Sequence, residues 1–196
     1  MNAPRFFRYV VWSALAVFLS ACGSAPTVRD SGLVGPDSKI SGDIRFVYRH
    51  SELKTTLQRV RGSVVYSENG YPEFGRFLVQ NAPEILARNG VGVVDSIWMD
   101  SKDRLDMSTP VPVLLVYASS GKVSASNNAT QVSFVFNAHL IDPVTRRVVW
   151  KASIDTSTWR GRDWVNRNFT QTLYDEDYAE ALLNALAVRM RQDGAI

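Results

Sequence analysis

The sequence contains two Ser-x-x-Lys motifs, and their spacing is its closest approach to a known catalytic arrangement. They run from Ser51 to Lys54 and from Ser119 to Lys122. In serine acyl-enzymes this spacing places a lysine beside the nucleophilic serine on one helical turn. The companion Lys-Thr-Gly is absent, and the second match lies in a stretch that is typical of a turn. We therefore predict that the protein is not an enzyme, and keep a hydrolase as the alternative.

Histidines and carboxylates are the remaining candidates for metal or acid–base chemistry. His139 is expected on the polar face of a strand, where no serine, cysteine or carboxylate motif identifies a partner for it. Cys22 is the only cysteine, which excludes an internal disulfide and the thiolate-rich zinc and iron–sulfur sites. No metal site and no cofactor are predicted. Four aspartates lack the spacing of a calcium loop and are expected to solubilise a loop: Asp95, Asp100, Asp103 and Asp106.

Aromatic and basic residues interleave between Thr158 and Thr172, and this segment is the best candidate for binding a partner. Tryptophan and arginine dominate binding hot spots because they combine a large buried area with directional contacts. The alternative is that the aromatic rings fold back onto the sheet edge while the arginines are solvated. The predicted contact residues are Trp159, Arg160, Arg162, Trp164 and Arg167.

The N-terminus has the pattern of a secretion signal. Arg5 and Arg8 precede an apolar stretch from Tyr9 to Leu19, which is too short for a comfortable transmembrane helix. Next comes Leu19-Ser20-Ala21-Cys22, an aliphatic residue, two small residues and a cysteine. This run resembles the lipobox of bacterial lipoproteins. The resemblance implies that residues 1–21 are a cleaved signal peptide and that Cys22 is lipidated.

The same resemblance implies where the mature chain resides. A processed lipoprotein cysteine carries two or more acyl chains, such as palmitate, and these suffice for stable anchoring where one chain would not. Gly23 follows the cysteine, at the position where Asp favours inner-membrane retention in proteobacterial lipoproteins. In a Gram-negative host the resemblance therefore implies an outer-membrane lipoprotein that faces the periplasm.

Composition and charge describe a globular domain without a basic excess. The chain is 45% hydrophobic and 21% charged, and its length suits one domain. When Arg5 and Arg8 leave with the signal, 20 basic side chains remain against 19 acidic ones. This balance gives no electrostatic case for nucleic-acid binding.

Hydrophobic periodicity predicts an α+β fold, a single layer of largely antiparallel sheet with two main helices packed on one face. Residues 22–42 are rich in Gly, Ser, Pro and Asp and are expected to form a flexible tether, so the domain is expected to span 43–196. The predicted order is strand, helix, strand, strand, hairpin, helix. The first strand is expected at Val64–Tyr66, after a short helix over Leu53–Val60. A helix over Pro72–Arg88, buried strands over Val91–Met99 and Val111–Ala118, a hairpin over Gln131–Thr156 and a final helix that starts at Asp175 follow.

Two features of the predicted helices follow from particular residues. Pro83 interrupts the helix over Pro72–Arg88, which predicts a kink or two abutting helices. The final helix carries an apolar stripe that should cover the sheet. Its members are Tyr178, Leu182, Leu186 and Met190, with Ala179, Leu183 and Ala187 beside them.

The hairpin turn from Leu140 to Trp150, followed by a helix rich in Ala and Leu, resembles the C-terminal part of several periplasmic accessory lipoprotein families. These are the auxiliary lipoproteins of ABC-type transporters and the penicillin-binding-protein activator and curli-export lipoproteins. The resemblance implies a non-catalytic accessory or assembly factor that binds another envelope protein complex. An envelope hydrolase and a carrier of a lipid or other apolar ligand are the alternatives.

Overall fold

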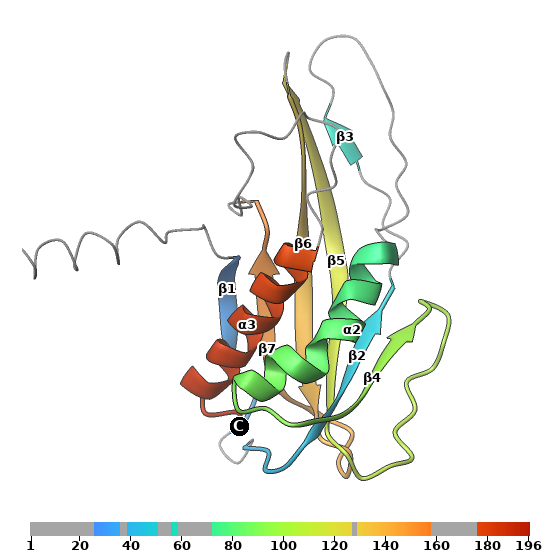
Figure 1. The fold of residues 1–196 in the computed structure, drawn as a ribbon, viewed down its shortest axis with the longest axis vertical. Coiled ribbons are helices and arrows are strands. Elements are labelled where there is room, and N and C mark those ends of the chain that lie inside the picture. The colour runs from blue at the N-terminus through green and yellow to red at the C-terminus, as the bar shows by residue number, and fades with distance from the viewer. Residues whose placement is uncertain (1–25, 36–38, 51–55, 59–71, 127–128, 158–175) are drawn as a thin grey trace, which may run out of the picture.

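A computed structural model describes the chain over residues 26–35, 39–50, 56–58, 72–126, 129–157 and 176–196. These residues form one mixed sheet with two helices, which confirms the predicted α+β class (Figure 1). Neither of the two helices is long and apolar enough to span a membrane.

The sheet contains seven strands: β1 (Thr27–Leu33), β2 (Ile44–Arg49), β3 (Thr56–Gln58), β4 (Val93–Met99), β5 (Val113–Ser126), β6 (Ala129–Ile141) and β7 (Val148–Asp155). Their spatial order is β1-β7-β6-β5-β2-β4, with β3 beside β5 off this path. The β1–β7, β7–β6 and β6–β5 pairings are antiparallel. Strand β2 is parallel to both of its neighbours, β4 and β5, and β3 is parallel to β5.

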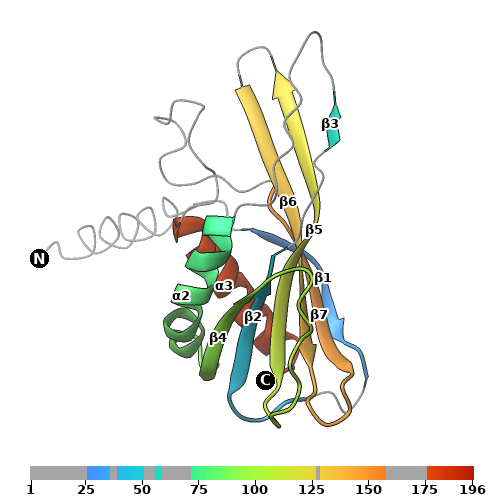
Figure 2. The ribbon, with the colours of Figure 1, turned by 90° about the vertical axis from the view of Figure 1, so that its right-hand side faces the viewer.

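Helices α2 (Pro72–Arg88) and α3 (Glu176–Gln192) pack on the same face of this sheet (Figure 2). The predicted stripe of α3 is confirmed, since all seven of its members are buried. Helix α2 contributes Phe74, whose ring lies 5.4 Å from that of Phe136 on β6 and 5.3 Å from that of Tyr178 on α3. The main core therefore lies between the two helices and one face of the sheet.

The predicted hairpin is β6 and β7, joined by a turn at Asp142. The carboxylate of Asp142 accepts the N–H of Val144 at 2.8 Å, and Arg146 adopts a left-handed φ of 56°. Leu140 and Trp150 are cross-strand partners, and both are fully buried on the helix side of the sheet. The alternating apolar pattern thus predicts both the hairpin and its buried face.

Pro83 lies inside α2 without ending it. The prediction of two abutting helices is wrong, because one helix runs from Pro72 to Arg88. Proline has no N–H, so the carbonyl of Val79, four residues earlier, loses its usual helical donor. The hydroxyl of Ser96 on β4 donates to this carbonyl at 2.7 Å. The neighbouring strand therefore supplies the hydrogen bond that the helix lacks.

The predicted tether over residues 22–42 is wrong for Thr27–Leu33, which form the edge strand β1. Val28 packs against the core, Arg29 forms an ion pair with Asp155, and Ser31 accepts a hydrogen bond from Arg189. Asp155 and Arg189 lie more than 100 residues away from β1 in the chain. The local sequence alone has no apolar period that indicates a strand, and the domain begins before residue 43.

Three further expectations are wrong. Residues 53–60 do not form a helix throughout, because Thr56–Gln58 is strand β3. The Ser119–Lys122 segment lies within the long strand β5 rather than in a turn. The run over Val91–Met99 does form a strand, but it is at the edge of the sheet, where Val94 is 52% exposed and Trp98 is 38% exposed.

Candidate functional site

A loop between β4 and β5 covers part of the sheet face opposite the helices. Its residues Leu105 and Met107 pack against a second, smaller apolar cluster on that face. The cluster consists of Val47, Met99, Val113 and Leu115. The sheet is therefore apolar on both faces near β2, and the loop shields the second face from water.

The aspartates of this loop shape it as well as solubilise it. The carboxylate of Asp100 accepts the N–H of Lys102 at 3.1 Å, and that of Asp103 accepts the N–H of Asp100 at 3.0 Å. Asp106 accepts the N–H of Ser108 at 2.9 Å. The Lys102 N–H lowers the pKa of Asp100, and hydrogen bonds from Ser108 lower the pKa of Asp106. Both carboxylates therefore stay ionised and keep the turns in place.

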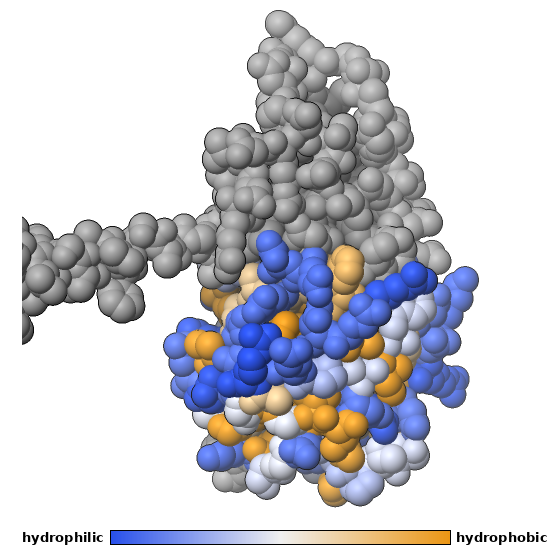
Figure 3. All heavy atoms as spheres, in the orientation of Figure 1, coloured by the Kyte–Doolittle hydropathy of each residue, from blue (hydrophilic) through white to orange (hydrophobic). Residues whose placement is uncertain are grey.

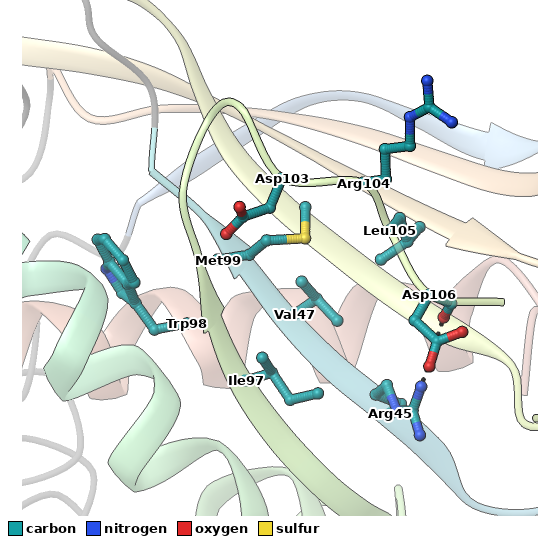
Figure 4. Close-up of a pocket in the computed structure, with 9 residues that line it drawn as sticks. All are labelled: Arg45, Val47, Ile97, Trp98, Met99, Asp103, Arg104, Leu105 and Asp106. Atoms are coloured by element: carbon teal, nitrogen blue, oxygen red, sulfur yellow. Dashed lines mark hydrogen bonds between the residues drawn. The ribbon is translucent and has the colours of Figure 1, made fainter. Parts of the chain in front are cut away.

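Between this loop and β4 lies a groove of about 370 Å³. Figure 4 shows the side chains of Val47, Ile97, Met99 and Leu105 gathered around it, while Trp98 points away from them toward α2. Arg45 and Asp106 lie at one end, and Asp103 and Arg104 lie on the loop that borders it. We call this the β4 groove, which has an apolar floor and a charged rim.

Arg45 on β2 forms hydrogen bonds to β4 and to the β4–β5 loop at one end of the β4 groove. Its Nε donates to both carboxylate oxygens of Asp95, at 2.9 and 3.0 Å, and its Nη1 donates to the backbone carbonyl of Asp106 at 3.4 Å. The Arg45 side chain is only 12% exposed. The sequence predicted that Asp95 solubilises a loop, and this is wrong. Asp95 lies on β4 and pairs with Arg45 on β2, a residue 50 positions earlier.

The lining of the β4 groove lacks the nucleophilic and basic residues that covalent catalysis uses. Its rim offers carboxylates and guanidinium groups, but its lining contains no serine, cysteine or histidine. The hydroxyl of Ser119 donates to the carbonyl of Val135 at 3.1 Å, and its strand backbone does not form the helical turn that a Ser-x-x-Lys site needs. Ser51 lies outside the described residues. Within the described residues, no three His, Cys, Asp or Glu side chains come together in a way that could hold a metal ion.

His139 is half-buried on the sheet face opposite the helices, in a different place from the groove. Its ring meets the edge of Tyr117, with centroids 5.5 Å apart, and the Tyr117 hydroxyl accepts a 3.5 Å hydrogen bond from Asn137. Burial, and to a smaller extent the charge of Lys151, lowers the pKa of His139. The neutral form of the ring is therefore favoured. The neighbours of the ring are the aromatic side chain of Tyr117 and the cationic side chain of Lys151, rather than a serine or cysteine nucleophile.

The residues that the sequence proposed for lipidation and partner binding lie outside the described residues: Cys22, Trp159, Arg160, Arg162, Trp164 and Arg167. The β4 groove was missed at the sequence level. One signal for it was available, because Asp95 interrupts an otherwise apolar run and a buried strand rarely carries an unpaired carboxylate. Its partner, Arg45, could not be identified from the spacing.

No protein-family model matches the sequence, and no curated protein matches it. Among solved structures, the chain resembles the PelC dodecamer of Paraburkholderia phytofirmans at 13% identity and a TM-score of 0.45, over 84% of this chain and 97% of that one. A neuraminyllactose-binding hemagglutinin homolog of Helicobacter pylori gives 12% identity and a TM-score of 0.44, over 83% and 94% of the two chains.

A Xanthomonas campestris protein of family DUF330 is similar at 14% identity and a TM-score of 0.41, over 88% of this chain and 98% of that chain. At such identities and TM-scores these resemblances say nothing of this protein's partner or assembly. Its function has to be inferred from its own residues.

Proposed function

We propose that this protein is a lipid-anchored envelope lipoprotein of the outer membrane that faces the periplasm and acts as a non-catalytic accessory or assembly factor for another envelope protein complex. The observation that carries the binding role is the β4 groove. Its apolar floor would accept apolar side chains of a partner, and its charged rim would orient them.

The form of the groove favours a protein partner over the alternatives. A hydrolase needs convergent nucleophilic and acid–base groups, which the groove lining lacks. A lipid carrier needs an apolar cavity that encloses most of its ligand. The β4 groove instead has three exposed charged residues on its loop side, Asp103, Arg104 and Asp106, as a protein interface with a polar rim does.

The anchoring role rests on the lipobox resemblance at Cys22. If this residue carries the lipid, β1 begins at Thr27, only five residues later. An extended chain spans at most about 3.6 Å per residue, so Thr27 would lie within about 18 Å of the anchored residue. The domain would then sit against the membrane rather than on the long tether that the sequence suggested.

The same geometry relates the anchor to the aromatic and basic segment at Trp159–Arg167. Thr27 is the register partner of Asp155 at the end of β7, and the segment follows only a few residues after Asp155. The segment therefore leaves the sheet at the end where the lipid anchor would lie. We retain Trp159, Arg160, Arg162, Trp164 and Arg167 as proposed partner contacts, next to the membrane.

The anchor is tested by Cys22→Ala, which should abolish incorporation of labelled palmitate and release the chain from membranes. Normal labelling of this variant would overturn the lipidation. This measurement does not depend on any partner.

The binding role is tested by photocrosslinking in cells from a photoreactive residue at position 104, on the rim of the β4 groove. The matched control carries the same residue at position 144, where Val144 is 82% exposed on the β6–β7 turn. We expect a discrete crosslink to an envelope protein from position 104 only. Identical products from both positions, or none from either, would contradict a role for the groove.

A further inference from the structure

Two adjacent rows of polar side chains cross the sheet on the face that carries no helix in Figure 2. The strand register is continuous through both rows. Neighbours along the strands, such as Val116 and Ala138, belong to the core on the helix side, so alternation places these polar side chains on the opposite face. We call them the outer-face rows. In order across β2, β5, β6 and β7 they are Arg49, Tyr117, Asn137 and Ser153 in one row, with His139 and Lys151 in the next.

The two cations of the outer-face rows have no counter-ion from the described part of the chain. The Nε of Arg49 is buried without a hydrogen-bond partner. Lys151 is exposed and lies beside His139 in the register. Asp30 on β1, the register partner of Ser153, is the carboxylate at the end of the rows, and it forms no ion pair with either cation. An anion bound to the rows would supply the missing charge.

The helix side of the molecule has a different distribution of charge. Figure 3 shows hydrophilic side chains across the helices. Acidic groups lie among the basic ones there, since Arg88 pairs with Glu84 and Glu180, and Arg189 pairs with Asp193. The helix side therefore mixes both signs, whereas the outer-face rows place no described carboxylate between their two cations.

We propose that the outer-face rows bind an acidic polysaccharide, whose carboxylates meet Arg49 and Lys151 while its sugar rings cross Tyr117 and His139. Strands β2 and β7 are three strand spacings apart, about 14 Å, so the two cations are too far apart to share one carboxylate. A ligand that meets both is therefore a chain with repeated acidic groups. Arginine and lysine bind carboxylates through charge-assisted hydrogen bonds.

The groups between the two cations suit a sugar. The Tyr117 hydroxyl accepts a 3.5 Å hydrogen bond from the Asn137 amide, and this phenol, this amide and the Ser153 hydroxyl can each both donate and accept. The hydroxyl groups of a sugar have the same double capacity. The rings of Tyr117 and His139, with centroids 5.5 Å apart, add apolar surface on which the C–H groups of a pyranose can pack.

An acidic peptide fits these rows less well. An extended peptide binds a sheet through backbone hydrogen bonds at an open strand edge. Strands β5, β6 and β7 each have a neighbouring strand on both sides, so their backbone groups are already used. The outer-face rows adjoin the β4 groove through Tyr117, which packs against the smaller apolar cluster. They take a different ligand from the groove, so their test needs no partner protein.

The test is isothermal titration calorimetry of the lipidated mature chain in detergent, with oligomers of galacturonate and of mannuronate as probes. We expect saturable binding to at least one of them and none to a neutral glucose oligomer of the same length. Lys151→Gln and Arg49→Gln should each weaken the binding at least about tenfold, because a charge-assisted hydrogen bond is lost. Arg76→Gln is the matched control, since it removes an exposed cation of α2 on the helix side and should leave the affinity unchanged.

A second readout is independent of the substitutions. The NMR signals of the His139 imidazole should shift as the oligomer binds to the wild-type chain. Absence of binding to both acidic oligomers would overturn the proposal. An equal loss of affinity in Arg76→Gln would overturn it as well, because it would indicate non-specific attraction. Binding of poly-L-glutamate as tight as that of the sugars would replace the polysaccharide by an acidic peptide.

Discussion

The hydroxyl of Ser96 on β4 donates to the backbone carbonyl of Val79 on α2, at 2.7 Å, and this is the carbonyl that Pro83 deprives of its helical donor. A proline inside a helix normally costs about 3 kcal/mol, in part because of this missing bond. The strand thus compensates a defect in the helix. It also fixes the position of α2 along β4, next to the exposed edge.

Replacing Ser96 by Ala should destabilise the domain by about 1–2 kcal/mol, because a partly buried carbonyl loses its donor. In a Pro83→Ala background the same replacement should cost less, since an alanine at this position has the N–H that proline lacks. Urea unfolding of the four variants in a double-mutant cycle measures this coupling. Equal costs in both backgrounds would show that the hydroxyl does not compensate Pro83.

Gly75 on α2 is required by the ring of Tyr48. A Cβ at this position would lie 2.2 Å from the Cε1 atom of Tyr48, which is buried under the helix, and 3.0 Å from the Trp98 ring nitrogen. Helix propensity alone would favour Ala over Gly by about 1 kcal/mol. Overpacking costs about 1–3 kcal/mol, so Gly75→Ala should be destabilising overall.

Gly92→Ala is the control for this substitution. A Cβ at Gly92 would meet the carboxylate of Asp43, which is an exposed side chain that can rotate away. The change should therefore alter the free energy of unfolding by less than about 0.5 kcal/mol. Chemical denaturation of both variants makes the comparison, and a Gly75→Ala protein as stable as wild type would mean that the Tyr48 ring moves freely.

Trp150→Ala should destabilise the domain by about 3–5 kcal/mol, because the side chain is fully buried. The ring nitrogen also donates to the carboxylate of Asp193 at 2.9 Å, which ties β7 to the C-terminal end of the chain. Trp150→Phe keeps most of the apolar volume but loses this hydrogen bond, so its cost should be smaller. A loss below about 1 kcal/mol for Trp150→Ala in denaturant unfolding would contradict the packing described.

His139 should make stability fall as the pH is lowered. Its pKa in the folded protein lies below the unfolded value of about 6.5, so the unfolded chain binds the proton more tightly. The contribution of the neutral ring is complete above the unfolded pKa and is lost as the pH falls from there through the folded pKa. His139→Gln should remove this part of the pH dependence of unfolding.

Lys151→Gln tests the electrostatic part of the same effect. Its removal should raise the pKa of His139, followed by NMR titration of the imidazole, without restoring the unfolded value, because burial is the larger cause. An unchanged His139 titration in this variant would exclude the influence of Lys151.

The amino-acid sequence by itself determined the elements whose apolar period is local. The helix over Pro72–Arg88, the buried stripe of the final helix and the hairpin with Trp150 inside all follow from side chains a few positions apart. For such elements the buried face is defined by the spacing alone, whatever they pack against.

The tertiary structure decided everything that depends on which strands become neighbours. Strand β2 lies between β4 and β5, which places Arg45 beside Asp95 and forms one end of the groove. A strand's apolar pattern does not say whether it will be central or at an edge, so β4 was expected to be buried. Strand β1, with almost no apolar pattern, exists because β7 offers it backbone partners.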